Sequence, residues 1–147
     1  EEAWKAMGNK ESVHLEDFLS CPENYCDNNL SKKWTIVKNI RRVATGAIEK
    51  IREEKIIRSS LEAHLDIYVS RDILKQINEI NFSEVAITSS FNLSEISNKI
   101  EGFSIDELEN IRVRPSKAKG QKCQRCWKYE EVLIKNEICN RCNEAIN

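Results

Sequence analysis

Two Cys-x-x-Cys pairs near the end of the sequence constrain its fold more than any other feature. Cys123 and Cys126 form the first pair, Cys139 and Cys142 form the second, and twelve residues separate the pairs. Each pair directs two thiolates toward one point, so two pairs complete a tetrahedron. Zn²⁺ suits such a site because it is borderline-soft, redox-inert and content with four sulfur ligands. We therefore predict one structural zinc ion per chain, with a short hairpin in the intervening loop.

Two other uses of paired cysteines fit the sequence less well. The start of the sequence has no apolar, signal-like stretch, which argues against a secreted domain with two disulfides. Redox proteins usually carry a single Cys-x-x-Cys that follows a strand of a βαβ unit. Protein ligands fill all four positions here, so the zinc site is predicted to hold a shape and to perform no catalysis. Cys21 and Cys26 have no partner pair nearby and are predicted to be free thiols.

The first cysteine pair lies in a basic and aromatic stretch that no acidic residue interrupts. Its basic residues are Arg112, Arg114, Lys117, Lys119, Lys122, Arg125 and Lys128. Arg125 and Trp127 flank Cys126, and Tyr129 follows. An exposed indole beside a cation on a metal-fixed turn suits an unpaired nucleobase, because the ring stacks while the guanidinium binds phosphate or a base edge. The alternative is that Trp127 packs over the metal site as a miniature core.

Charge is distributed in alternating blocks. The formal net charge is −1, but residues 1–31 carry −5, residues 32–58 carry +6, residues 59–111 carry −7 and residues 112–147 carry +5. Local fields matter more than the total for a bound polyanion, so the two basic blocks are candidate nucleic-acid surfaces. No run is apolar and long enough to cross a membrane.

A long amphipathic helix is predicted over residues 29–55, capped by Asn28 or Asn29. Its apolar stripe comprises Leu30, Trp34, Val37, Ile40, Ala44, Ala47, Ile48 and Ile51. The opposite face carries Lys32, Lys38, Arg42 and Lys50. Such a basic ridge can follow a phosphate backbone, and Lys38 and Arg42 are its candidate contacts. The alternative is an ordinary solvated face, since Glu49 and Glu53 dilute the positive charge.

A small, acidic α/β unit is predicted over residues 64–115. We expect strands at 65–69, 85–87 and 111–113, a helix capped by Ser70, and a short helix over 94–102 ended by Gly102. Residues 12–18 are expected to be extended. The predicted fold class is therefore α+β, with a helical segment, a small mixed α/β domain and a C-terminal four-cysteine zinc finger.

Two short motifs carry a resemblance to a known family. The stretch Lys122-Cys-Gln-Arg-Cys-Trp127 with its downstream Cys-x-x-Cys, together with Ser60-Leu-Glu-Ala63, resembles the C-terminal region of bacterial-type isoleucyl-tRNA synthetases. The family usually has glycine where Arg58 stands. A related finger ends the formamidopyrimidine-DNA glycosylases, but a helix–two-turn–helix precedes it there, whereas a strand–helix–strand unit is predicted here.

The resemblance implies a domain division and a function. Residues 1–63 would end a helical anticodon-binding domain, residues 64–115 would form a junction domain, and residues 116–147 would form the zinc module. The parent enzyme would ligate isoleucine to its tRNA with ATP, as a monomer in the cytoplasm. The expected partners are isoleucine tRNA and the catalytic domain of the same polypeptide. The candidate tRNA contacts are Lys38, Arg42, Lys122, Arg125, Trp127 and Lys128.

Catalytic signatures are missing from the sequence. It contains neither His-Ile-Gly-His nor Lys-Met-Ser-Lys-Ser, and its four glycines are too far apart for a nucleotide-binding loop. We therefore expect a fragment of a longer protein, starting at Glu1, that is inactive alone and leaves ATP to the missing catalytic domain. A zinc-held protein-interaction module without nucleic acid is the third hypothesis, and it predicts negligible RNA binding at low salt.

Overall fold

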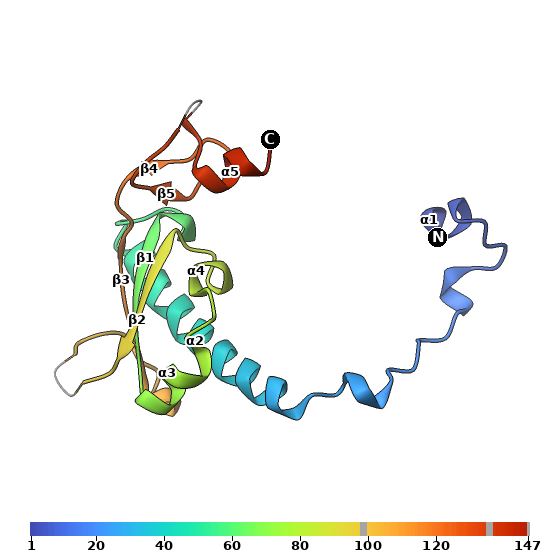
Figure 1. The fold of residues 1–147 in the computed structure, drawn as a ribbon, viewed down its shortest axis with the longest axis horizontal. Coiled ribbons are helices and arrows are strands. Elements are labelled where there is room, and N and C mark those ends of the chain that lie inside the picture. Colours follow the sequence, from blue (N-terminus) through green and yellow to red (C-terminus); the bar gives the residue numbers. More distant parts are fainter. Residues whose placement is uncertain (98–99, 135–136, 147) are drawn as a thin grey trace.

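The structure is a computed structural model and describes residues 1–97, 100–134 and 137–146. A long helix lies on one face of a three-stranded sheet, and a small cysteine-rich module follows at one end of that sheet (Figure 1). The elements are α1 (Glu2–Ala6), α2 (Asn28–Glu53), β1 (Ala63–Val69), α3 (Arg71–Ile77), α4 (Phe82–Val85), β2 (Ser90–Glu95), β3 (Ile111–Lys117), β4 (Gln121–Lys122), β5 (Tyr129–Glu130) and α5 (Asn140–Glu144). The mixed α+β class predicted from the sequence is confirmed.

The long helix α2 forms close to its predicted bounds, but its cap differs. Asp27 is the N-cap residue, and its carboxylate accepts from the backbone N–H groups of Asn29 and Leu30 at 2.8 and 2.9 Å. The predicted asparagine cap is therefore wrong by one residue, because Asp27 satisfies two helix-start donors at once. At the other end Lys55 takes a positive φ of 59°, and the Lys55 and Ile56 N–H groups bind Arg52 O and Ile51 O. This left-handed residue ends the helix.

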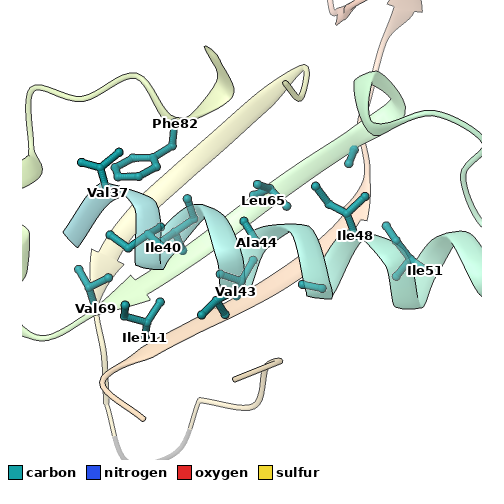
Figure 2. Close-up of a cluster of buried hydrophobic side chains, with 14 of the residues drawn as sticks. Val37, Ile40, Val43, Ala44, Ile48, Ile51, Leu65, Val69, Phe82 and Ile111 are labelled. Atoms are coloured by element: carbon teal, nitrogen blue, oxygen red, sulfur yellow. The ribbon is translucent and has the colours of Figure 1, made fainter. Parts of the chain in front are cut away.

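The apolar stripe of α2 packs against β1 and β3 (Figure 2). Seven of its side chains are buried: Val37, Ile40, Val43, Ala44, Ala47, Ile48 and Ile51. Two residues predicted for the stripe are not in this core, because Leu30 and Trp34 remain 50% and 44% exposed. They precede the first buried residue of the helix, where α2 extends past the sheet.

The sheet has the order β2-β1-β3, with β1 parallel to β2 and antiparallel to β3. Burial alternates along β1, where Ala63, Leu65, Ile67 and Val69 face the core. The predicted first and last strands are confirmed. A parallel β1–β2 pair needs a crossover, and α3 and α4 supply it. Ser70 occupies the N-cap position of α3, but its side chain makes no capping hydrogen bond.

Three predicted elements are wrong. The strand predicted at 85–87 is not formed. Asn81 accepts from the Ser83 N–H at 3.1 Å and caps α4, which ends at Val85, Ile87 has a φ of 56°, and the second strand comes later as β2. The predicted helix over 94–102 is not formed at its described ends: β2 runs to Glu95, residues 100–102 are not helical, and Phe103 forms a bridge to Val113 on β3. Residues 98–99 of that prediction lie outside the described part. Within residues 12–18 the segment Val13–Leu15 forms a 3₁₀ turn capped by Ser12, and not a strand.

Two further features bear on the sequence predictions. Arg58, which stands where the resembled family has glycine, is not among the residues with positive φ, so the backbone at this position does not require glycine. Within the described residues, every helix is either too short or too polar to cross a lipid bilayer.

Candidate metal centre and nucleic-acid interface

The first cysteine pair is built on the β4–β5 hairpin. Gln121 pairs with Glu130 and Lys122 pairs with Tyr129, which brings the two ends of the hairpin together. Inside it the Cys123 N–H donates to Lys128 O at 2.9 Å, and the Trp127 N–H donates to Cys123 O at 3.0 Å. These bonds fold the turn tightly enough that Trp127 has a φ of 65°. A left-handed conformation is costly for a bulky residue, so the surrounding contacts must hold it in place.

The second cysteine pair lies at the start of the last helix. Cys139 is the N-cap residue of α5, and Cys142 is buried in that helix. The chain reaches it through a return at the bridge between Ile134 and Ile138, which agrees with the predicted hairpin at its described positions. The Gln124 N–H donates to Glu137 O at 3.1 Å and joins the two halves of the module.

The four sulfur atoms of Cys123, Cys126, Cys139 and Cys142 all lie within 4.8 Å of one another. All six cysteines are free thiols, which excludes the two-disulfide alternative for this structure. Zinc–sulfur bonds of ~2.3 Å place tetrahedral ligands ~3.8 Å apart, and Cys126 Sγ lies 3.7 Å from Cys139 Sγ. The donor set therefore fits one zinc ion held entirely by protein. Cys21 and Cys26 are exposed and take no part in the cluster.

The surroundings of the sulfurs shift the pKa values of the cysteine thiols in different directions. Burial opposes ionisation of Cys123, but backbone N–H groups of Cys126, Cys139 and Arg125 donate to its sulfur and lower its pKa to about 6. Burial raises the pKa of Cys126 to about 12, and burial also raises that of Cys139. Metal binding must therefore displace protons from Cys126 and Cys139, and metal affinity rises with pH.

One carboxylate on α4 binds both halves of the zinc module. Glu84, on α4, accepts from Lys128 Nζ at 2.8 Å and from Arg141 Nη1 at 3.0 Å. Each cysteine pair contributes one of these cations, since Lys128 follows the first pair and Arg141 lies within the second. Lys128 lowers the pKa of Glu84, with a smaller contribution from Arg141. This contact is therefore complete at neutral pH and weakens only as the pH falls below the usual range of a glutamate.

A second fastening runs through a buried serine. The hydroxyl of Ser89 accepts from the Tyr129 N–H at 2.6 Å and donates to Leu61 O, so it joins β5 to the segment that precedes β1. The Ala118 N–H also donates to Glu62 O at 2.7 Å. Neither Glu84 nor Ser89 has a signal in the sequence, because each is an isolated polar residue whose partners lie between 28 and 57 positions away.

Three predicted contact residues are exposed within or beside the turn of the first cysteine pair. Trp127 is 58% exposed, which decides against the alternative that it packs over the metal as a core. Lys122 Nζ lies 5.1 Å from the centre of the indole ring, a cation–π distance. Arg125 is exposed, and its side chain makes no hydrogen bond or ion pair with any described residue. Lys122, Arg125 and Trp127 are thus three exposed cationic or aromatic residues of one hairpin, and together we call them the knuckle surface.

The other three predicted contact residues lie elsewhere. The Lys128 side chain is only 12% exposed, because it binds Glu84. Lys38 is exposed on the first half of α2, and Arg42 is exposed just past its middle, where Arg42 Nη1 binds Glu107 Oε2 at 3.1 Å. Figure 1 places that half of α2 at the opposite end of the sheet from β4 and β5. The structure therefore does not bring the helix ridge and the knuckle surface together.

No family model matches the chain. Comparison with curated proteins does find similar sequences among the isoleucine–tRNA ligases. It is 36% identical over 131 residues to an isoleucine–tRNA ligase of Brucella abortus biovar 1 and 38% identical over 136 residues to that of Bradyrhizobium diazoefficiens. The chain is homologous to one segment of isoleucine–tRNA ligases. The matches cover 88% and 90% of this chain but only 14% of each ligase. The ligase of Natranaerobius thermophilus matches 99% of the chain at 32% identity, and 17% of its own length.

Proposed function

We propose that this chain is the tRNA-binding, C-terminal segment of an isoleucine–tRNA ligase, and that it binds the anticodon stem–loop. The whole protein would attach isoleucine to its tRNA using ATP, with the chemistry performed by a catalytic domain outside these 147 residues. Homology to a segment of the ligases supports the assignment to the enzyme. The knuckle surface is the observation that supports RNA as the partner of this segment.

The proposed mechanism uses each residue of the knuckle surface differently. Trp127 offers an exposed ring to an unpaired base, and stacking of this kind contributes ~1–3 kcal/mol per base. Lys122 lies against the same ring and brings positive charge to the backbone of a stacked nucleotide. Arg125 has its guanidinium free for phosphate or a base edge. Bound zinc supplies rigidity, because it fixes the turn that carries all three side chains.

The remaining predicted contacts have separate parts in the proposal. Lys38 and Arg42 would meet the stem of the tRNA, at a distance from the loop bound by the knuckle surface. Lys128 is assigned instead to holding the module in place through Glu84. The division at residues 63 and 115, the monomeric state and the cytoplasmic location remain predictions of the family resemblance.

Removing the knuckle side chains tests the proposed site. In the zinc-loaded chain, Arg125→Ala with Trp127→Ala is expected to weaken binding of the isoleucine anticodon stem–loop by about 5- to 150-fold, the equivalent of one lost stacking contact. Fluorescence anisotropy with labelled RNA at low salt measures the effect. The matched control is Trp4→Ala with Arg71→Ala, which removes the same residue types far from the module. Equal affinity of the knuckle variant and the parent would show that the site is wrong.

Glu84 tests whether the orientation of the module matters. Glu84→Ala removes a negative charge close to the RNA site, so simple electrostatics predicts tighter binding. If Glu84 positions the module, binding is instead expected to weaken by about three- to tenfold, because only the Ser89 and Ala118 hydrogen bonds then orient the knuckle surface. Residual dipolar couplings should show that the orientation of the module to the sheet has become less well defined. Glu79→Ala, an equal charge change on an 83%-exposed side chain, is the control. Tighter RNA binding by Glu84→Ala would refute the positioning role.

A further inference from the structure

A groove lies between the end of the sheet and the zinc module, and nothing in the proposal above uses it. Its volume is about 400 Å³, within the range of small-ligand sites. The sheet end of its lining includes Lys117 and Lys119, the module contributes Glu130 and Glu131, and His64 and Tyr129 also line it. Neither lysine makes an ion pair with a described residue.

The polar floor of the groove is organised by hydrogen bonds across the strands. His64 Nδ1 lies 2.8 Å from Ser90 Oγ, and His64 Nε2 lies 3.3 Å from Asp66 Oδ1. Asp66 in turn accepts from Asn92 at 3.1 Å. The imidazole is thus held from both sides and remains 22% exposed to the groove. A preorganised polar lining that carries both lysines and glutamates favours a ligand that carries both an anion and hydrogen-bond donors.

The β4–β5 ladder links the groove to the knuckle surface. Tyr129, on its rim, pairs in the β4–β5 ladder with Lys122, whose ammonium lies over the Trp127 ring. A single residue pair therefore separates the groove from the stacking indole. Lys119, Lys122 and Arg125 give a spaced series of cations along this path, as a single-stranded backbone requires.

We propose that this groove binds one nucleotide of the RNA strand, adjacent to the base that stacks on Trp127. The phosphate lies against Lys117 and Lys119, and the base edge turns toward Glu130 and Glu131, whose carboxylates accept from exocyclic amino groups. This inference rests on the proposed function, since it extends the same RNA path by one nucleotide.

Two histidines and three tryptophans make the test specific. The His64 ring resonance reports on the groove and the Trp127 indole resonance reports on the knuckle surface. His14 and Trp4, on the N-terminal segment, are internal controls. The zinc-loaded chain is titrated with the isoleucine anticodon stem–loop and, separately, with guanosine 5′-monophosphate. We expect the RNA to shift both His64 and Trp127 at the same concentration, while His14 and Trp4 stay unchanged.

Each other outcome has a definite meaning. A shift of Trp127 without His64 overturns the groove and leaves the proposed function standing. No shift of either residue with RNA overturns both. A His64 shift with the mononucleotide but not with the RNA makes the groove a free-nucleotide site and overturns the RNA path.

A double variant gives a second, quantitative check. Lys117→Ala with Lys119→Ala is expected to abolish the His64 shift, preserve the Trp127 shift and reduce the salt dependence of RNA binding by about 0.7 per lost phosphate contact. Lys10→Ala with Lys75→Ala removes the same charge from exposed positions away from the groove and should change none of these. An unchanged His64 shift in the groove variant would overturn the assignment of the two lysines.

Discussion

Cys142→Ser is expected to abolish zinc binding and to unfold the module that follows β3, while the sheet and α2 remain folded. The serine hydroxyl is a poor zinc ligand, and three sulfurs leave the ion open to water. Structural zinc contributes ~10–16 kcal/mol in small modules of this kind. The module has little else to hold it, because its buried cluster consists of three of the cysteines and Ile138. A core of that size does not fold unaided.

Zinc content and backbone amide spectra measure this prediction together. The parent should hold one zinc per chain and the variant none, and amide signals of residues 121–146 should collapse to disordered positions in the variant alone. The control is Cys21→Ser with Cys26→Ser, which alters two exposed thiols outside the cluster and should leave zinc content unchanged. A folded module in Cys142→Ser would mean that the four cysteines do not organise it.

Ile40→Ala is expected to destabilise α2 and the sheet together by about 2–5 kcal/mol. Ile40 is fully buried on the α2 face that packs on β1 and β3, and it belongs to the same buried cluster as Leu65 and Val113. Truncation leaves a cavity that neither element can close alone. Urea unfolding gives the magnitude, and amide exchange shows which strands lose protection.

The outcome also bears on the division predicted at residue 63. Leu30→Ala, on the exposed start of the same helix, is the matched control and should cost less than about 1 kcal/mol. If amides of β1 keep full protection in Ile40→Ala while those of α2 lose it, the helix and the sheet are separate cooperative units. Joint loss of protection would place α2 with the sheet, across the predicted boundary.

Elements with a clear period were predictable from the sequence. Apolar residues spaced three and four apart predict α2, and alternating apolar residues predict β1 and β3, because burial of one face imposes these periods directly. The segment Val85-Ala-Ile87 misled because a short apolar run does not distinguish a helix from a strand. Its structure is decided by the Asn81 cap and by Phe82, which is fully buried and packs edge-on against Phe91 at 5.9 Å between ring centres.

The features of the site likewise divide into those that a local sequence pattern predicts and those that depend on the three-dimensional fold. Four-cysteine spacing predicts the metal ligands because ligand geometry is local to each pair. The sequence does not decide whether Trp127 is exposed or packed, because only the three-dimensional turn shows which side of the metal the indole occupies. The Glu84 contacts and the groove depend on how the module docks on the sheet, and no local pattern encodes that docking. Lys128 illustrates the consequence: its place in a basic stretch predicts an RNA contact, and only the docking of the module shows that its ammonium binds Glu84.

Binding of tRNA to the zinc-loaded chain tests the central claim most directly. Isoleucine tRNA and a control tRNA with a different anticodon are each titrated at low salt, with and without a zinc chelator. The account predicts tighter binding of isoleucine tRNA, a steep loss of affinity with salt, and loss of the preference when zinc is removed. Equal affinity for both tRNAs, or a preference that survives complete removal of zinc, would contradict it.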